Sequence, residues 1–194
     1  MRLLDLAKNY RVKSFINTDS ILNKNISNYS LSKHHFAEWL KLFSKDFYCC
    51  NLKIEHFFGP NDDDTKFIIS IIKSFLKKKN IVNFTRGNQK RDFIYIDDVV
   101  LAIQKILLHS LKQKKGFETF EIGSGNSISI KDIVRLTKKL CNNNTTKLSF
   151  GKIPMRKNEA LQVNLDLKKL FKLKWKPKCS IEDSLKKTIN YYNK

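Results

Sequence analysis

Glycine and proline are scarce in this chain, which has 6 of the first and 3 of the second among 194 residues. That scarcity, with 41% hydrophobic and 29% charged residues, excludes collagen-like, low-complexity and wholly disordered chains. No apolar run approaches the roughly 18 to 20 residues of a membrane span. The N-terminus also lacks the apolar stretch and cleavage site of a signal peptide. We therefore expect one folded, cytoplasmic domain with a sizeable core.

Cysteine is also sparse, with four residues and no CxxC spacing. Cys49 and Cys50 are adjacent and cannot easily bridge to each other. Cys141 and Cys179 lie far apart in the sequence. We expect reduced thiols, with neither a disulfide framework nor a metal site.

Acidic residues are outnumbered: 38 Lys+Arg against 18 Asp+Glu leave a formal net charge of +20. Only six of the basic residues are arginine, the residue whose bidentate fork reads bases and phosphates specifically. The lysines are spread over the whole chain. Such a charge governs solubility and non-specific attraction, so we expect no specific nucleic-acid partner.

Helical and strand-like segments alternate along the chain. We expect helices at residues 1–9, 29–44, 65–76, 97–109 and 130–141 and after Ser180, and strands at residues 12–17, 47–58, 81–85 and 117–122. The first strand is predicted to end at the polar turn Thr18–Ser20, and Asp97 is predicted to cap its helix. This order is typical of an α/β fold with a parallel sheet.

Tyr29 and Lys33 are four residues apart on a predicted helix, so they project from the same face. A nearby ammonium stabilises the phenolate form of a tyrosine, which makes the tyrosine a usable general acid or base. Thr18 follows the preceding strand, at the carboxyl edge where open α/β sheets bind ligands. Its hydroxyl is predicted to contact the same substrate oxygen as Tyr29. Chance spacing and a plain turn residue remain the alternatives.

Several motifs in order then carry a family resemblance. They are Thr18-Asp19-Ser20, Tyr29-x-x-x-Lys33, His56-Phe57-Phe58-Gly59-Pro60, the run from Gly87 through Arg91 to Val99, Phe120 to Gly125, Arg156-x-x-Glu159, and Trp175 to Leu185. This order resembles the extended short-chain dehydrogenase/reductases, the NAD-dependent nucleotide-sugar epimerases and dehydratases. The resemblance spans nearly the whole chain and implies a partial Rossmann-like parallel sheet plus a small C-terminal α/β substrate-binding region.

The resemblance implies a role for each matching residue. Thr18, Tyr29 and Lys33 would be catalytic, and Tyr29 and Lys33 would also hold the nicotinamide ribose of NAD. Substrate contacts would come from a larger set: Asp19, Ser20, His56, Arg91, Arg156 and Glu159. Two positions depart from the family pattern, because Ser20 stands where dehydratases have Glu and His56 replaces the usual Asn. An isolated histidine beside aromatic residues is also typical of simple packing.

The family's Gly-rich turn for the NAD pyrophosphate is not found in this sequence. Gly123-Ser124-Gly125 lacks the third glycine and the later acidic residue, so we interpret it as a turn. The chain resembles the C-terminal portion of such an enzyme. We expect residues 1–60, with 85–110, to be the rest of the NAD-binding domain, and residues 61–194 to be mostly the substrate region.

The resulting hypothesis is a truncated epimerase/dehydratase for surface polysaccharide sugars, inactive as this chain alone. Its partners would be a nucleotide sugar and a separate N-terminal half or a second copy, without a membrane. Two alternatives stay open: an inactive remnant, or a basic, non-enzymatic protein that binds nucleic acid or an anionic surface.

Overall fold

The computed structural model describes residues 2–155 and 160–193 and confirms the α/β fold class. The chain divides into two compact units, each assembled from three separate stretches. The first unit comprises Met1–Glu55, Val99–Gly123 and Leu165–Lys176, and the second comprises His56–Asp98, Ser124–Asn164 and Pro177–Lys194. In the part of the chain described, no helix is long and apolar enough to cross a membrane.

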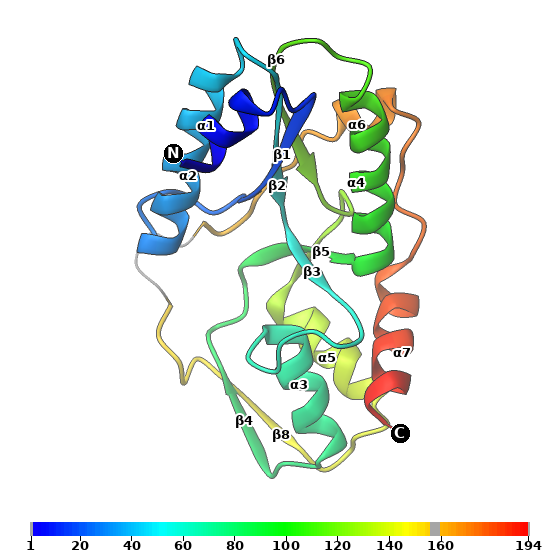
Figure 1. Ribbon diagram of the computed structural model, residues 1–194. Coiled ribbons are helices and arrows are strands. Elements are labelled where there is room, and N and C mark those ends of the chain that lie inside the picture. Colours follow the sequence, from blue (N-terminus) through cyan, green and yellow to red (C-terminus); the bar gives the residue numbers. More distant parts are fainter. Residues whose placement is uncertain (1, 156–159, 194) are drawn as a thin grey trace. The chain divides into compact units, whose positions relative to one another are not determined.

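The first unit is a parallel sheet with helices on both faces (Figure 1). Its strand order is β1 (Ser14–Ser20), β2 (Tyr48–Ile54), β6 (Gly116–Ile122). Its helices are α1 (Arg2–Asn9), α2 (Asn28–Phe43), most of α4 (Ile96–Ser110) and α6 (Lys168–Lys172). The central strand β2 begins with five buried residues, as expected for a strand that is covered on both faces.

The helix α2 side of this sheet is an aromatic core. Phe15 of β1 packs 6.1 Å from Phe36 and 6.4 Å from Phe47 between ring centroids. Leu4 of α1 and Leu40 of α2 are fully buried in the same cluster. The helical spacing of apolar residues in α2 thus buries one face of the helix against β1 and β2.

The three strands are in register from their first residues. Ser14 lies opposite Tyr48, and Tyr48 lies opposite Gly116. Their carboxyl ends therefore meet at one edge of the sheet, where Ser20 lies opposite Ile54. The polar end of β1 thus lies at the edge where parallel α/β sheets bind ligands.

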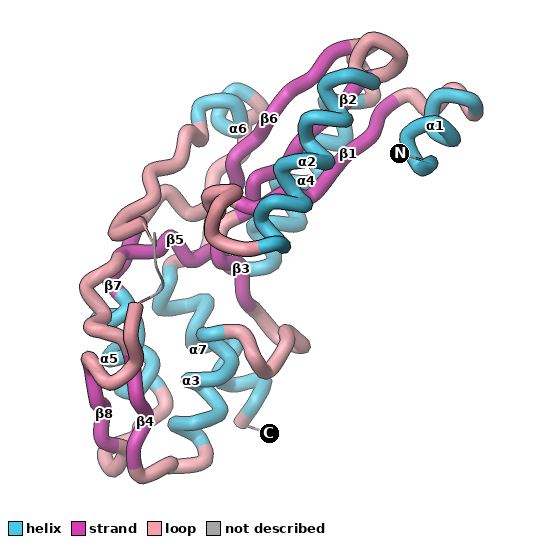
Figure 2. The backbone as a smooth tube through the Cα atoms, turned by 90° about the vertical axis from the view of Figure 1, so that its left-hand side faces the viewer, coloured by secondary structure: helices cyan, strands magenta, loops and turns pink. Residues whose placement is uncertain are grey.

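The second unit contains two small sheets, with strand orders β3-β5-β7 and β4-β8 (Figure 2). Its strands are β3 (His56–Phe58), β4 (Ile81–Phe84), β5 (Lys90–Tyr95), β7 (Ser127–Ser129) and β8 (Lys147–Phe150). Its helices are α3 (Phe67–Leu76), α5 (Ile130–Leu140) and α7 (Ile181–Tyr192). Apolar side chains from α3, α5, α7 and β5 form one buried core.

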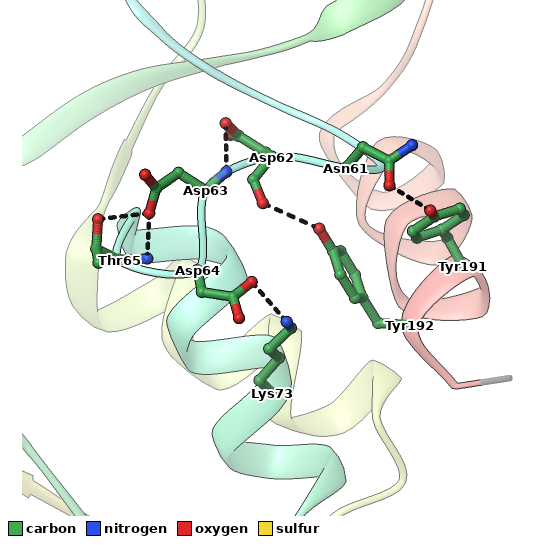
Figure 3. Close-up of polar contacts among 8 residues, drawn as sticks. All are labelled: Asn61, Asp62, Asp63, Asp64, Thr65, Lys73, Tyr191 and Tyr192. Carbon is green, nitrogen blue, oxygen red and sulfur yellow. Dashed lines mark hydrogen bonds and ion pairs between the residues drawn. The ribbon is translucent and has the colours of Figure 1, made fainter.

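The C-terminal helix α7 is held to the loop that follows β3 (Figure 3). Tyr191 donates a hydrogen bond to the Asn61 side chain, and the Tyr192 hydroxyl donates to the Asp62 carbonyl over 3.2 Å. The Lys73 ammonium lies 4.9 Å from the centroid of the Tyr192 ring. The two hydrogen bonds join residues 130 positions apart and hold helix α7 against the rest of the second unit.

Several expected boundaries are wrong. β1 continues through Thr18–Ser20, where we predicted a turn, because all three residues pair with β2. The apolar run 47–58 is two strands that belong to different sheets, and Lys90–Tyr95 is a strand that we did not predict. Asp97 lies inside the first turn of α4 rather than at its cap.

The strand pairing is also not parallel throughout, as the expected parallel sheet would require, because β5 and β7 are antiparallel. The unit boundaries differ from those expected as well. Residues 85–98, expected with the first unit, lie in the second, while Leu165–Lys176 returns to the first. The assignment of one unit to NAD and the other to the substrate stays a prediction.

Candidate active site

Thr18 lies near the carboxyl end of β1, with its side chain exposed on a strand whose other residues are mostly half-buried. Its backbone carbonyl accepts a hydrogen bond from the Lys33 ammonium over 2.9 Å. This bond links the end of the strand to α2. It places the Lys33 charge at the Thr18 backbone.

Helix α2 places Tyr29 and Lys33 on successive turns at this edge. Its start is fixed by a capping box, in which Ser27 accepts from the Ser30 backbone N–H while the Ser30 hydroxyl contacts the Ser27 backbone N–H. The Lys33 ammonium lies 5.7 Å from the centroid of the Tyr29 ring. The Tyr29 side chain is 58% exposed, so its hydroxyl is accessible to a ligand. Thr18, Tyr29 and Lys33 are thus brought together within one unit.

Asp19 is buried and held by two donors. Its carboxylate accepts from the Asn51 side-chain amide over 2.8 Å and from the Ser20 backbone N–H over 2.7 Å. Asn51, also buried, accepts from the Asn17 side chain over 2.8 Å. The three side chains form a ladder across β1 and β2, which fixes the backbone on either side of Thr18. Ser20 accepts from the Leu22 N–H over 3.2 Å, which closes the turn after β1.

Two other residues predicted to bind substrate, Arg91 and His56, lie in the second unit. Arg91 of β5 is 6% exposed, and its guanidinium donates to the backbone carbonyls of Lys90 and Ala160 over 2.6 and 2.9 Å. His56 of β3 is half-buried with its ring edge-on to Phe93 at 5.6 Å, which is the packing contact that the sequence offered as an alternative. The other two residues predicted to bind substrate, Arg156 and Glu159, lie outside the described residues.

Two backbone N–H groups of the turn Gly123-Ser124-Gly125 already bind a carboxylate. Asp92, 1% exposed, accepts from the Ser124 N–H over 2.7 Å and from the Gly125 N–H over 2.6 Å. A phosphate would have to displace this buried anion to reach the two donors. The contacts support the interpretation of this segment as a turn rather than a pyrophosphate cradle.

The comparison with known proteins agrees with the geometry at β1 and α2. The sequence profile described as the NAD dependent epimerase/dehydratase family matches residues 1–123. The chain belongs to this family. The resemblance predicted from the ordered motifs is therefore confirmed.

Relatives within the epimerase/dehydratase family include CDP-abequose synthase of Salmonella typhimurium, 36% identical over 96% of this chain and 67% of that protein. UDP-glucuronate 4-epimerase of Thermodesulfobacterium geofontis is 30% identical over 98% of this chain and 62% of its own length. The fold matches UDP-glucose 4-epimerase of Thermotoga maritima with a TM-score of 0.83 and 24% identity, over 98% of this chain and 66% of that one. The chain thus spans about two thirds of the length of these relatives.

Sequence reasoning missed two residues of this family member that organise the units. Asn51 holds Asn17 and Asp19 in the first unit, and Asp98 accepts from the Lys178 and Cys179 N–H groups over 3.0 Å each in the second. A signal for Asn51 was present, since it is a polar residue between the apolar residues Cys50 and Leu52 of a strand. Nothing in the sequence pairs Asp98 with a segment 80 residues away.

Proposed function

We propose that this chain carries the acid–base half of an NAD-dependent nucleotide-sugar epimerase or dehydratase that makes sugars for surface polysaccharides in the cytoplasm. The observation that carries the proposal is the juxtaposition of Thr18, Tyr29 and Lys33 at the carboxyl end of β1. The names of the relatives, CDP-abequose synthase and UDP-sugar epimerases, support the same substrate class.

In this proposal Tyr29 donates or accepts a proton at a sugar oxygen. The Lys33 ammonium binds the Thr18 carbonyl and lies near the Tyr29 ring, and the Thr18 hydroxyl would donate a hydrogen bond to the same sugar oxygen. NAD, when bound, supplies the hydride acceptor. Lys33 and Tyr29 would contact its nicotinamide ribose.

The residues described fit the nicotinamide end of NAD but not its pyrophosphate. The one Gly-x-Gly turn has its N–H donors bound to Asp92, and a pyrophosphate requires free N–H groups. We propose that a segment outside the described residues supplies that cradle. Within the described residues β1 pairs with β2 alone, so the other edge of β1 offers backbone donors and acceptors to such a segment.

The family resemblance assigns further substrate contacts to residues of both units. Asp19 and Ser20 would contact the substrate beside Thr18. Arg91 and Arg156 would hold the nucleotide diphosphate, for which a guanidinium fork suits, and Glu159 would make a further substrate contact. His56 would line the sugar.

The experiment is reconstitution. The chain is co-expressed with the part of CDP-abequose synthase that it does not cover, and the purified complex is tested with CDP- and UDP-sugars for substrate conversion and for NADH absorbance. Conversion by the complex, but by neither part alone, supports the proposal. A stable complex that binds NAD and converts no sugar would contradict it and favour the inactive remnant.

A further inference from the structure

A basic cavity lies at the opposite end of the first unit's sheet from Thr18. Its volume is about 370 Å³, and it is lined by Lys8, Arg11, Val12, Lys13, Asp46, Phe47 and Lys114. Lys13 immediately precedes β1, whereas Thr18 lies near the other end of this strand. Since a strand rises about 3.3 Å per residue, the cavity is well over 10 Å from the candidate active site and does not belong to it.

The lining carries four cations and one carboxylate. Asp46 pairs with Lys8, with 3.2 Å between the ammonium and a carboxylate oxygen. Arg11, Lys13 and Lys114 form no ion pair with any described residue. Three positive charges thus remain uncompensated around one cavity. Neighbouring lysines in the same loops, Lys45, Lys112 and Lys115, add to the local charge.

The end of helix α1 does not neutralise these charges. The carbonyls of Ala7 and Lys8 already accept hydrogen bonds from the Val12 and Arg11 N–H groups over 2.9 and 3.0 Å. These bonds also turn the chain so that residues 11–13 line the cavity. The Ala7 and Lys8 carbonyls are therefore already used in the turn that follows α1.

We propose that this cavity binds a small ligand with clustered phosphate groups, such as an inorganic polyphosphate or a nucleoside polyphosphate. Ammonium and guanidinium groups form strong charge-assisted hydrogen bonds to phosphate oxygens, and the Arg11 fork suits a bidentate contact. Three uncompensated cations match a ligand with at least three negative charges. The volume lies within the range of small-molecule sites.

The test measures tripolyphosphate binding to the full chain by calorimetry at physiological salt. The cavity variant is R11Q/K13Q/K114Q. The matched control is K105Q/K168Q/K172Q, which removes the same charge from exposed lysines of the same unit outside the cavity. We expect saturable one-to-one binding, weakened at least about tenfold in the cavity variant and less than about twofold in the control.

Equal weakening in both variants, or no saturable binding, would overturn the proposal. Melting temperatures establish that the variants are folded. If the triple variant does not fold, the single change Lys114→Gln replaces it, and the expected loss of tripolyphosphate affinity is then about threefold. If UTP displaces tripolyphosphate, the site is assigned to nucleoside polyphosphates. If tripolyphosphate stays bound when UTP is added, the site is assigned to inorganic polyphosphate. A different outcome is that tripolyphosphate does not bind, while duplex DNA binds weakly and equally to the cavity variant and to the control. That outcome would identify a non-specific basic surface instead.

Discussion

Two buried carboxylates each accept two consecutive backbone N–H donors from a segment far along the chain. Asp92 binds the turn at Ser124 and Gly125, and Asp98 binds Lys178 and Cys179 just before α7. Both side chains are 1% exposed. Since a buried carboxylate is costly unless its hydrogen bonds are made, each residue ties its distant segment to the second unit.

We expect Asp98→Asn to destabilise the protein by roughly 2–3 kcal/mol, because an amide cannot accept two hydrogen bonds with both of its terminal atoms. Asp97→Asn is the matched control, since Asp97 is exposed in the same first turn of α4. Chemical denaturation of both variants measures the difference. Equal destabilisation by the two changes would contradict this role of Asp98.

Glu118 is part of a polar cluster on the α4 side of the first unit's sheet. Tyr48 donates to its carboxylate over 2.6 Å, and the His109 ring nitrogen lies 3.3 Å from the same oxygen. Burial raises the pKa of Glu118, but the hydrogen bonds and the charge of His109 outweigh this effect, and the pKa is lowered from 4.5. Burial and the bond to Glu118 raise the pKa of the Tyr48 hydroxyl, so it remains a donor.

A lowered folded-state pKa means that the unfolded chain binds the proton at Glu118 more readily. The contribution of Glu118 to stability is therefore present above pH 4.5, its unfolded value, and is lost as the pH falls through the lower folded value. We expect Glu118→Gln to flatten the fall in melting temperature in this acid range. If the melting temperature of the variant falls with decreasing pH as steeply as that of the original protein, Glu118 does not contribute to this pH dependence of stability.

At the scale of elements, four helices end in the same capping motif. After α1, α3, α5 and α6, the residue at the turn has a positive φ: Arg11 at 53°, Lys78 at 48°, Asn142 at 51° and Lys174 at 56°. Each donates its N–H to a carbonyl three residues back, and the next residue donates to one five residues back. Glycine is the usual residue here, and this glycine-poor chain uses cations or asparagine instead.

Replacing Lys78 by glycine is expected to stabilise the protein by roughly 0.5–1 kcal/mol, since the left-handed conformation costs a residue with a Cβ atom roughly 1–2 kcal/mol and glycine's greater freedom when unfolded offsets part of the gain. Asn142→Gly is the comparison and should gain less, because asparagine tolerates this conformation better. Thermal unfolding of the two variants compares them. A loss of stability in Lys78→Gly would contradict the capping account.

Local patterns predicted the helices well and the strand pairing poorly. The 3.6-residue periodicity placed α2, and Ser129 and Ser180 cap α5 and α7 as their sequences indicate. β5 was missed because its buried residues include the charged Arg91 and Asp92, so it lacks the pattern of a strand. Its antiparallel partner β7 begins 37 residues after the β5 start, and no short-range signal joins the two segments.

In the candidate site, too, the residues that local patterns mark were predictable, and the contacts that depend on strand pairing were not. Tyr29 and Lys33 follow from helical spacing, and Thr18 from its place near the end of a strand, although the strand continues through Ser20 rather than ending before Thr18 as predicted. The ladder through Asn51 was not predictable, because it depends on the register between β1 and β2. The two-unit division was also beyond local patterns, since each unit draws on three separate stretches.

At the scale of the whole molecule, the first unit has an open sheet edge. Within the described residues β1 pairs on one side only. Helix α1 presents Leu3 and Leu6, and Tyr10 follows in the turn after it; 59%, 51% and 80% of their surfaces are exposed. An unpaired edge and an exposed apolar face are features of an interaction surface, which agrees with our proposal that another segment docks there.

Amide hydrogen exchange tests this edge directly. Alternate N–H groups of β1 point away from β2, so we expect about half of the β1 amides to exchange rapidly while those of β2, flanked on both sides, stay protected. Addition of the complementary segment should protect the rapid β1 amides. Uniform protection of β1 in the isolated chain would show that this edge is already covered.

The measurement that tests the central claim most directly is the activity of Tyr29→Phe in the reconstituted complex, with Tyr191→Phe of the second unit as the control. If Tyr29 transfers the proton beside Lys33 and Thr18, its loss should lower kcat by about 10²–10⁴ while NAD binding changes little. The control should retain its rate. Full activity in Tyr29→Phe would contradict the assignment of this site.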